Sequence, residues 1–168
     1  SNGIFILLTS KLNLLLDTIT SRCQLIRFRS LSSKQINFIL EDCLEHSKFD
    51  IKKKLNIQDL IDSANGSPGQ LLKNIEIWNE LSNEILFKLE SPIKNILEIL
   101  EESKLISEQL DINRQICLVN LIQIIWWRKT KSIALVKKLE NLKLYLRSNV
   151  QPRLAWEITL LKISMDDI

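Results

Sequence analysis

The sequence is poor in the residues that make turns and crosslinks. It has 3 glycines, 3 prolines, 3 cysteines and 1 histidine among 168 residues. Sandwiches and barrels need many tight turns, so this scarcity argues against both folds and favours long helices. The single histidine, His46, ends a polar helical segment, where a histidine is typical of a solvated cap. No serine–histidine or cysteine–histidine catalytic set can be built around it.

The cysteines indicate neither a metal site nor disulfides. Cys23, Cys43 and Cys117 are far apart, odd in number and form no CxxC pair. Free thiols favour a reducing compartment. The longest apolar stretch, residues 116–127, is interrupted by polar residues and is too short to cross a bilayer, and no secretory signal is visible. We therefore predict a cytoplasmic protein with no metal and no membrane partner.

The positive charges are scattered along the chain. The formal net charge is +3, whereas nucleic-acid-binding proteins usually show a concentrated basic stripe. The densest run, Lys52-Lys53-Lys54, is typical of a solvated loop. Trp126-Trp127-Arg128-Lys129 has the residue types that stack on bases and bind phosphates. The alternative, which we favour, is that both tryptophans continue a buried helix face and the charges mark its exposed end.

Two short apolar runs near the start are typical of strands. Ile4–Leu8 is continuously apolar and ends in Thr9 and Ser10, a pattern expected of a buried parallel strand with polar residues at its carboxyl end. Residues 12–19 predict a short helix, and Leu25–Phe28 predicts a second strand. Because a parallel strand needs neighbours, we expect a fragment of a larger α/β core.

After residue 30 the pattern becomes helical. Apolar residues at helical spacing predict three short helices, at residues 32–48, 57–64 and 68–81. Ser32 and Gln35 fit a capping box at the start of the first helix. Asn65-Gly66 is a natural end for the second, and Ser67-Pro68 is a typical start for the third. These helices form a small bundle.

A second bundle is predicted from residue 91 onward. Ser91-Pro92 repeats the cap-then-proline signal and predicts a helix through Leu100. Residues 109–129 are apolar nearly all round, as expected of a buried central helix. A further stripe covers residues 133–146, and a last helix runs from Pro152 to about Ser164.

Three separated motifs resemble one family. The stretch "FILLTS…LLDTITSRCQLIRF" resembles the end of the ATPase core in clamp-loader subunits of the AAA+ superfamily. "SANGSPGQLL" resembles the lid, and "SNVQPRLAWEITLL" the closing collar helix, of the delta-prime subunits of bacterial DNA polymerase III. The order and spacing agree over essentially the whole chain. The resemblance implies a mainly α fold with an AAA+ α/β remnant of two short strands at 1–30, a three-helix lid at 31–85 and a helical collar at 86–168.

By this resemblance, Arg22 is an arginine finger. It stands between Ser21 and Cys23 in a Ser-Arg-Cys turn, where the small neighbours would pack tightly. Such a finger points into the ATP site of the next subunit and stabilises the charge that develops on the γ-phosphate. The residues alone leave a second interpretation open, in which Arg22 pairs with a carboxylate of its own chain.

The resemblance also implies that this chain does not hydrolyse ATP. No GxxxxGK[ST] loop and no Walker-B strand occur. The lid turn Gly66-Ser67-Pro68-Gly69 is followed by no cation until Lys73, so a sensor-2 arginine is missing. Both glycines are then expected to serve turn geometry and close packing. Thr9 and Ser10 stand at the sensor 1 position, or they only form hydrogen bonds at a strand end.

The implied partners are other subunits of the loader. The collar would pack with the delta and gamma/tau subunits in a five-membered ring, and the assembly would contact the sliding clamp and primer-template DNA. No cofactor is expected on this chain, and ATP is expected in the neighbouring subunit. Pro152, Arg153 and Trp156 are candidate collar contacts, although core packing is an equal alternative for Trp156. Two other functions remain open: a fragment of an active gamma/tau-type ATPase, and a plain helical interaction module.

Overall fold

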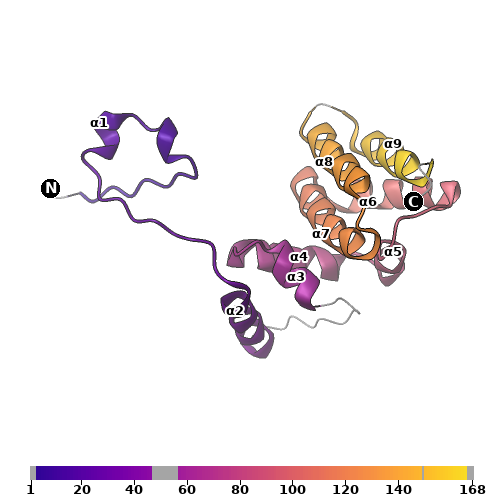
Figure 1. The fold of residues 1–168 in the computed structure, drawn as a ribbon, viewed down its shortest axis with the longest axis horizontal. Helices are drawn as coiled ribbons and strands as arrows, with labels where there is room; N and C mark the ends of the chain where they lie inside the picture. The colour runs from indigo at the N-terminus through magenta and orange to yellow at the C-terminus, as the bar shows by residue number, and fades with distance from the viewer. Residues whose placement is uncertain (1–2, 47–56, 149, 166–168) are drawn as a thin grey trace.

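The computed structural model describes residues 3–46, 57–148 and 150–165, and these residues form helices and turns without a strand. Figure 1 shows residues 3–30 extending away from two groups of packed helices. The described residues form one 3₁₀ helix and nine α-helices: η1 Leu12–Leu14, α1 Asp17–Thr20, α2 Ser33–His46, α3 Ile57–Ser63, α4 Pro68–Glu80, α5 Asn83–Lys88, α6 Ile96–Gln109, α7 Ile112–Thr130, α8 Ile133–Arg147 and α9 Pro152–Met165. No helix among the described residues is both long and apolar enough to span a membrane.

The two predicted strands are not formed in the described structure. Residues 4–8 and 25–28 belong to no helix or strand, and their apolar side chains are exposed, with Phe5 at 92%. A strand is stable only when a neighbouring backbone accepts and donates its hydrogen bonds. None of the described residues does so here, and only η1 and α1 are ordered into helical turns between the two segments.

The three helices predicted between residues 32 and 81 are confirmed as α2, α3 and α4. After the resemblance alone, we call α2–α4 the lid helices and α6–α9 the collar helices. The backbone N–H of Ser32 donates to Oε1 of Gln35 at 3.0 Å, and the N–H of Gln35 donates to Oγ of Ser32 at 3.4 Å, which is the expected capping box. Ser67 caps α4, and Pro68 takes its first position. Nδ2 of the buried Asn74 on α4 donates to Oγ of Ser63 on α3 at 2.8 Å. The buried apolar side chains of these helices include Ile36, Leu40, Leu60, Ile61, Leu71, Ile75 and Trp78.

The collar helices α6, α7, α8 and α9 pack in the spatial order α6–α9–α8–α7. Trp126 on α7 and Trp156 on α9 are fully buried in it. The prediction that both tryptophans of the Trp126-Trp127 pair are buried was wrong for Trp127, which is 38% exposed. Successive helical residues are about 100° apart, so two neighbours seldom face the same way.

The start of the collar also differs from the prediction. Ser91-Pro92 does not begin a helix, and α6 starts at Ile96, where the Asn95 side chain accepts a hydrogen bond from the N–H of Leu97 at 3.0 Å. The short helix α5 was not predicted. Proline fixes only its own φ, which is also found in extended chain, so cap-then-proline does not by itself start a helix.

The lid and collar helices share one core. Helices α3 and α4 both pack against α7, and a single cluster of buried apolar side chains runs from α2 to α9. The domain boundaries expected at residues 30 and 85 therefore stay a prediction, because this packing continues across the second one.

Candidate functional site

The turn that carries Arg22 follows directly from α1. The N–H of Ser21 donates to the Asp17 carbonyl at 2.9 Å, and the N–H of Arg22 donates to the Ile19 carbonyl at 3.1 Å. The N–H of Cys23 continues the pattern as a donor to Thr20 at 3.3 Å. These backbone bonds hold the Ser-Arg-Cys turn, while all three side chains lie at the surface.

Arg22 is exposed and forms no ion pair with any carboxylate in the described part of the chain. Residues 21–30 are all exposed, so this exposure alone does not decide between the two interpretations, and the finger role stays a prediction. Ser21 and Cys23 are likewise exposed, so the tight packing expected of them is not seen here.

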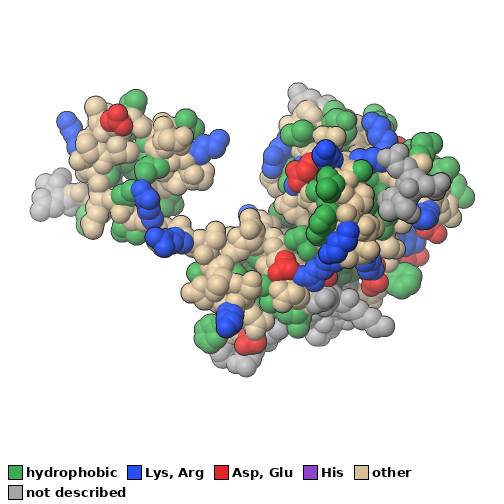
Figure 2. All heavy atoms as spheres, viewed as in Figure 1, with side chains coloured by type: hydrophobic (Ala, Val, Ile, Leu, Met, Phe, Trp, Pro, Cys, Tyr) green, Lys and Arg blue, Asp and Glu red, His purple; other side chains and the backbone are tan. Residues whose placement is uncertain are grey.

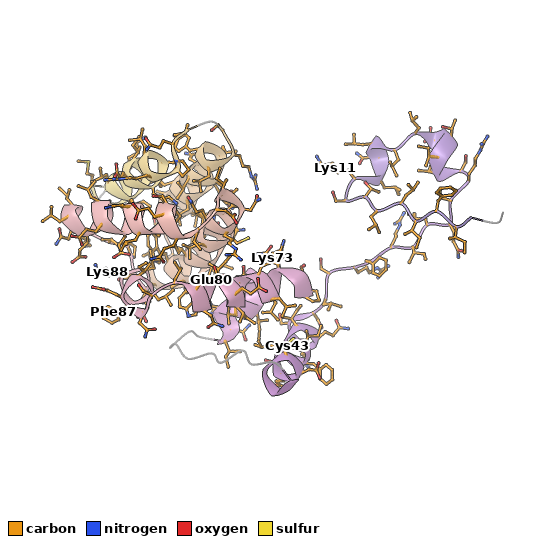
Figure 3. All side chains as sticks on the ribbon, turned by 180° about the vertical axis from the view of Figure 1, so that it is seen from behind. Lys11, Cys43, Lys73, Glu80, Phe87 and Lys88 are labelled. Atoms are coloured by element: carbon orange, nitrogen blue, oxygen red, sulfur yellow. The ribbon has the colours of Figure 1, made fainter. Side chains whose placement is uncertain are left out.

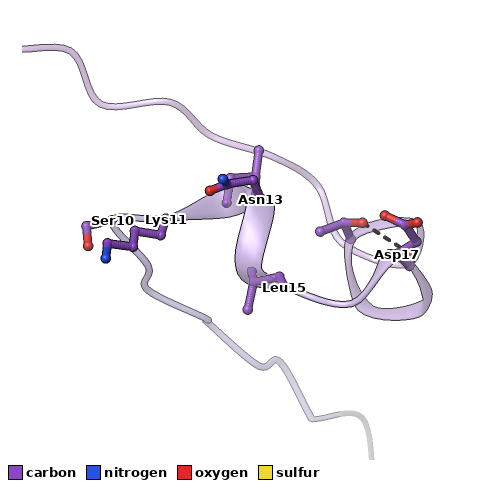
Figure 4. A pocket seen from close by; sticks show the side chains of 7 residues that line it. Ser10, Lys11, Asn13, Leu15 and Asp17 are labelled. Carbon is purple, nitrogen blue, oxygen red and sulfur yellow. Dashed lines mark hydrogen bonds between the residues drawn. The ribbon is translucent and has the colours of Figure 1, made fainter.

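A shallow hollow of about 510 Å³ adjoins this turn (Figure 4). It is lined by residues of the loop and of α1, namely Ser10, Lys11, Leu12, Asn13, Leu15, Asp17 and Thr20. The Thr9 hydroxyl accepts from the backbone N–H of Lys11 at 3.0 Å and so caps a local turn. Ser10 lies beside it at the rim of the hollow. Both residues predicted as sensor 1-like are exposed.

The lid turn is fixed by a close backbone approach at Gly66. Asn65 and Gly66 have φ values of 47° and 76°, and the Gly66 carbonyl accepts from the N–H of Leu31 at 2.9 Å. A Cβ at position 66 would lie 2.6 Å from Cβ of Ser30, so only glycine fits. The prediction that Gly69 serves close packing was wrong, because no atom lies within 4 Å of a Cβ built at this position. The Gly66 contact ties the lid to the segment that leads back to Arg22.

Ion pairs link the lid helices to the collar helices. The Arg128 guanidinium on α7 pairs with both Asp59 and Asp62 on α3. Asp59 is only 8% exposed, and burial raises the pKa of its carboxyl although Arg128 acts in the opposite direction. Nearby, the Trp126 indole N–H donates to the Leu89 carbonyl at 2.8 Å.

Further polar contacts connect α4 with α7. Nε2 of Gln70 donates to Oδ1 of Asn74 at 2.8 Å and lies 3.3 Å from Sγ of Cys117. At the other end of α4, the Arg114 guanidinium pairs with Glu80 at 2.7 Å. The orientation of the lid on the collar is thus set by charge and hydrogen bonding as well as by apolar packing.

The last helix begins at the predicted proline, but its side chains divide between surface and core. Pro152 takes the first position of α9, and the exposed Arg153 pairs with Glu157 at 2.7 Å. Trp156 is fully buried, and its indole N–H donates to Oε1 of Gln115 at 2.9 Å. Of the two roles left open for Trp156, core packing is the one observed.

One comparison identifies the family. Residues 34–163 match the profile of the family described as "Cyanobacterial DNA polymerase III delta prime, C-terminal domain", which is 130 of the 168 residues. The chain belongs to this family. Comparisons with curated proteins and with solved structures gave no match. The delta-prime resemblance of the lid and collar motifs is therefore confirmed over the matched range.

The matched delta-prime domain contains only part of the predicted site. Its range includes the lid turn Gly66–Gly69 and the collar candidates Pro152, Arg153 and Trp156, but it begins after Arg22. The structure brings the lid turn next to Ser30 and Leu31, whereas the collar candidates lie on α9 at a separate place. Among the described residues, no group of three His, Cys, Asp or Glu is arranged to hold a metal.

Sequence reasoning missed the charged groups inside this delta-prime domain. One such group is the ion pairs of Arg128 with Asp59 and Asp62. Another is Glu102 on α6, which is fully buried and pairs with Lys88 on α5 at 2.9 Å. The Glu102 carboxylate raises the pKa of the Lys88 ammonium by accepting its hydrogen bond. One signal was present: Glu102 shares a helix face with Ile99 and Ile106, at spacings of three and four residues.

Proposed function

We propose that this chain is a non-catalytic, delta-prime-like subunit of a cytoplasmic bacterial clamp loader and that Arg22 acts as an arginine finger on ATP held by the neighbouring subunit. The family match over the lid and collar carries the first part. The second part is supported by the Ser-Arg-Cys resemblance and by an exposed Arg22 that forms no ion pair with a carboxylate among the residues that the structure describes.

The chemistry of Arg22 suits this role. Arginine stays charged at any physiological pH, and its planar fork of N–H groups matches phosphate oxygens. Arginine fingers contribute roughly 10³–10⁵ in rate in well-studied nucleotide hydrolases. Because the backbone bonds of the turn hold Arg22 by its main chain, the side chain stays free to reach a nucleotide on another subunit.

The exposed segments around Arg22 fit the AAA+ part of the proposal. Residues 4–8 and 25–28 present unpaired backbone and exposed apolar side chains, which is what strands of a parallel sheet require other strands to cover. In the assembled core these segments would flank the finger, and Thr9 and Ser10 would stand at the sensor 1 position.

The proposed lack of ATP hydrolysis by the chain itself follows from its residues. The first positions of α4 are Pro68, Gly69 and Gln70, so no guanidinium stands where active loaders carry sensor 2. The nearest cation on that helix is Lys73. Nucleotide would thus be held by the gamma/tau subunits, with the sliding clamp and primer-template DNA contacted through the assembly.

Reconstitution tests this proposal. The full-length gene product is mixed with the delta and gamma/tau subunits, and native mass spectrometry is used to count subunits in the complex. We expect a five-membered complex that contains one copy of this protein, and no ATP turnover by the protein alone. Absence of any complex at micromolar concentrations would contradict the clamp-loader assignment, and turnover by the isolated protein would favour an active ATPase instead.

A further inference from the structure

Among the described residues, the segment that carries Arg22 meets the helices beside Gly66. Residues 21–30 are all exposed, and Figure 2 shows residues 3–30 joined to the helices by a narrow connection of chain. At this connection the N–H of Leu31 donates to the Gly66 carbonyl at 2.9 Å, and the Leu31 side chain packs against the apolar core. The contact with Gly66 therefore fixes where this segment leaves the lid helices.

The close approach of the two backbones at Gly66 leaves no room for a side chain. A Cβ at this position would lie 2.6 Å from Cβ of Ser30, 2.7 Å from the carbonyl oxygen of Leu31 and 2.9 Å from its nitrogen. Ordinary contacts of a Cβ begin at 3.4 Å, so the chain at Ser30 and Leu31 would have to move by about 0.8 Å. All three atoms belong to the backbone or are bonded directly to it, so rotation of a side chain cannot relieve the clash.

Both sides of this contact are held by other elements. The N–H of Asn65 donates to the Asp62 carbonyl at 3.2 Å, and the Asp62 carboxylate pairs with the Arg128 guanidinium on α7. The capping box of α2 begins with the residue that follows Leu31. The turn is therefore supported by α3 and α7, and Leu31 by the start of α2, so the contact has a fixed place on the lid helices.

The place of this contact bears on Arg22 because the chain between them is short. Leu31 follows Arg22 by nine residues, which span at most roughly 30 Å when fully extended. Residues 25–28, which the proposed function places in a strand beside the finger, end three residues before Leu31. In the assembled core, a shift at Leu31 would therefore displace or strain this strand, and the Ser-Arg-Cys turn ends two residues before the strand begins.

We propose that Gly66 is a positioning residue for Arg22 and that its backbone contact with Leu31 sets the distance of the finger from the nucleotide of the neighbouring subunit. The inference rests on the proposed function and adds a residue that acts on the nucleotide only through the finger. A misplacement of about 1 Å in a group that acts on a reaction can cost about 10²-fold in rate. The displacement of about 0.8 Å that a methyl group at position 66 would require is of this size.

Single-turnover hydrolysis at the adjacent site of the reconstituted, DNA-stimulated loader tests this. Full-length protein carrying Gly66→Ala should slow hydrolysis about 10- to 100-fold and leave the ATP affinity of that site unchanged, as loss of an interaction made in the transition state does. Gly69→Ala is the matched control, because a Cβ there has no atom within 4 Å, and its loader should hydrolyse ATP at the unaltered rate. In an Arg22→Ala background, Gly66→Ala should have no further effect, because a residue that acts only through the finger has no effect without it.

Two further variants separate a loss of position from a loss of stability. Lys88→Met should destabilise the fold at least as much as Gly66→Ala, because it leaves the buried Glu102 carboxylate unpaired. Figure 3 shows Lys88 far from Lys11 and the extended segment, so its variant should hydrolyse ATP at the unaltered rate. Leu31→Ala keeps the backbone contact, removes a partly buried side chain that anchors it, and should slow hydrolysis about threefold or more.

The outcomes separate this inference from the proposed function. An unaltered rate with Gly66→Ala, together with a slow rate with Arg22→Ala, would overturn the positioning role and leave the finger intact. Further slowing by Gly66→Ala in the Arg22→Ala background, or an equal loss with Lys88→Met, would also overturn the positioning role. Where Gly66→Ala fails to fold, an unaltered rate with Leu31→Ala overturns it. An unaltered rate with Arg22→Ala would overturn the finger and the positioning role together.

Discussion

The ion pairs between the lid and collar helices depend on the Arg128 guanidinium, and the variant Arg128→Met measures its contribution to the free energy of unfolding. Methionine keeps much of the apolar length but removes the charge, so Asp59 stays buried beside Asp62 without its guanidinium partner. Removing one partner of a buried ion pair costs about 3–5 kcal/mol. Because the Arg128 side chain is 31% exposed, water offsets part of that cost, and we expect a loss of about 2 kcal/mol at neutral pH.

The pH dependence distinguishes this mechanism from lost packing. Burial already raises the pKa of Asp59, and removal of Arg128 raises it further. A carboxyl whose pKa is higher in the folded than in the unfolded protein destabilises the fold above the unfolded pKa, which is about 3.9 for aspartate. This penalty is relieved as pH falls through the folded pKa. The stability difference between the variant and the unaltered protein should therefore shrink on acidification.

Urea unfolding followed by tryptophan fluorescence, at neutral and at acidic pH, provides the measurement. The control is Lys137→Met, which removes an exposed cation on α8 and should change the free energy of unfolding by less than about 0.5 kcal/mol. Combining Arg128→Met with Asp59→Asn should cost less than the two single changes together. An Arg128→Met variant as stable as the control, or a difference that grows on acidification, would refute the reasoning.

Two further changes probe the lid turn and the buried pair. Gly66→Ala should lower the free energy of unfolding by about 2 kcal/mol or more, because φ at this position is positive and the new Cβ would lie 2.6 Å from Cβ of Ser30. The control, Gly69→Ala, should not destabilise the fold. Equal effects of the two changes in thermal unfolding would show that the close approach at Gly66 is unimportant. Lys88→Met should lower the free energy of unfolding by about 3 kcal/mol, because it leaves the buried Glu102 carboxylate unpaired. The double variant Lys88→Met/Glu102→Leu should regain most of that stability. Because Glu102 raises the pKa of Lys88, the contribution of the pair is complete below the ordinary lysine pKa of about 10.4 and is lost as pH rises through the raised value. Stability that is flat across this alkaline range would contradict it.

Local signals predicted the helices where a cap and an apolar stripe agreed. Ser32 with Gln35, Ser67 with Pro68, and Pro152 all begin helices where the sequence indicated. Each of these signals depends on a side chain and a backbone group within four residues of each other, so no tertiary information is needed. Ser91-Pro92 failed because Asn95 offers a competing cap four residues later.

Contacts between residues far apart in the chain could not be predicted from the sequence. Asp59 and Arg128 are separated by 69 positions, and no local sequence pattern around either residue predicts the ion pair between them. The buried Trp156 was likewise undecided, because its partner Gln115 stands on another helix. The strands expected at residues 4–8 and 25–28 failed for a related reason, since a strand is defined by the neighbour that it pairs with.

The central claim is that Arg22 completes the ATP site of another subunit, and ATP turnover by the reconstituted, DNA-stimulated loader tests it most directly. The full-length protein carrying Arg22→Ala is compared with Arg27→Ala, a nearby exposed arginine outside the turn. Arg22→Ala should assemble normally yet slow hydrolysis at the adjacent site by about 10³-fold or more in single-turnover measurements, and Arg27→Ala should not. Hydrolysis by the Arg22→Ala loader at the unaltered rate would contradict the account.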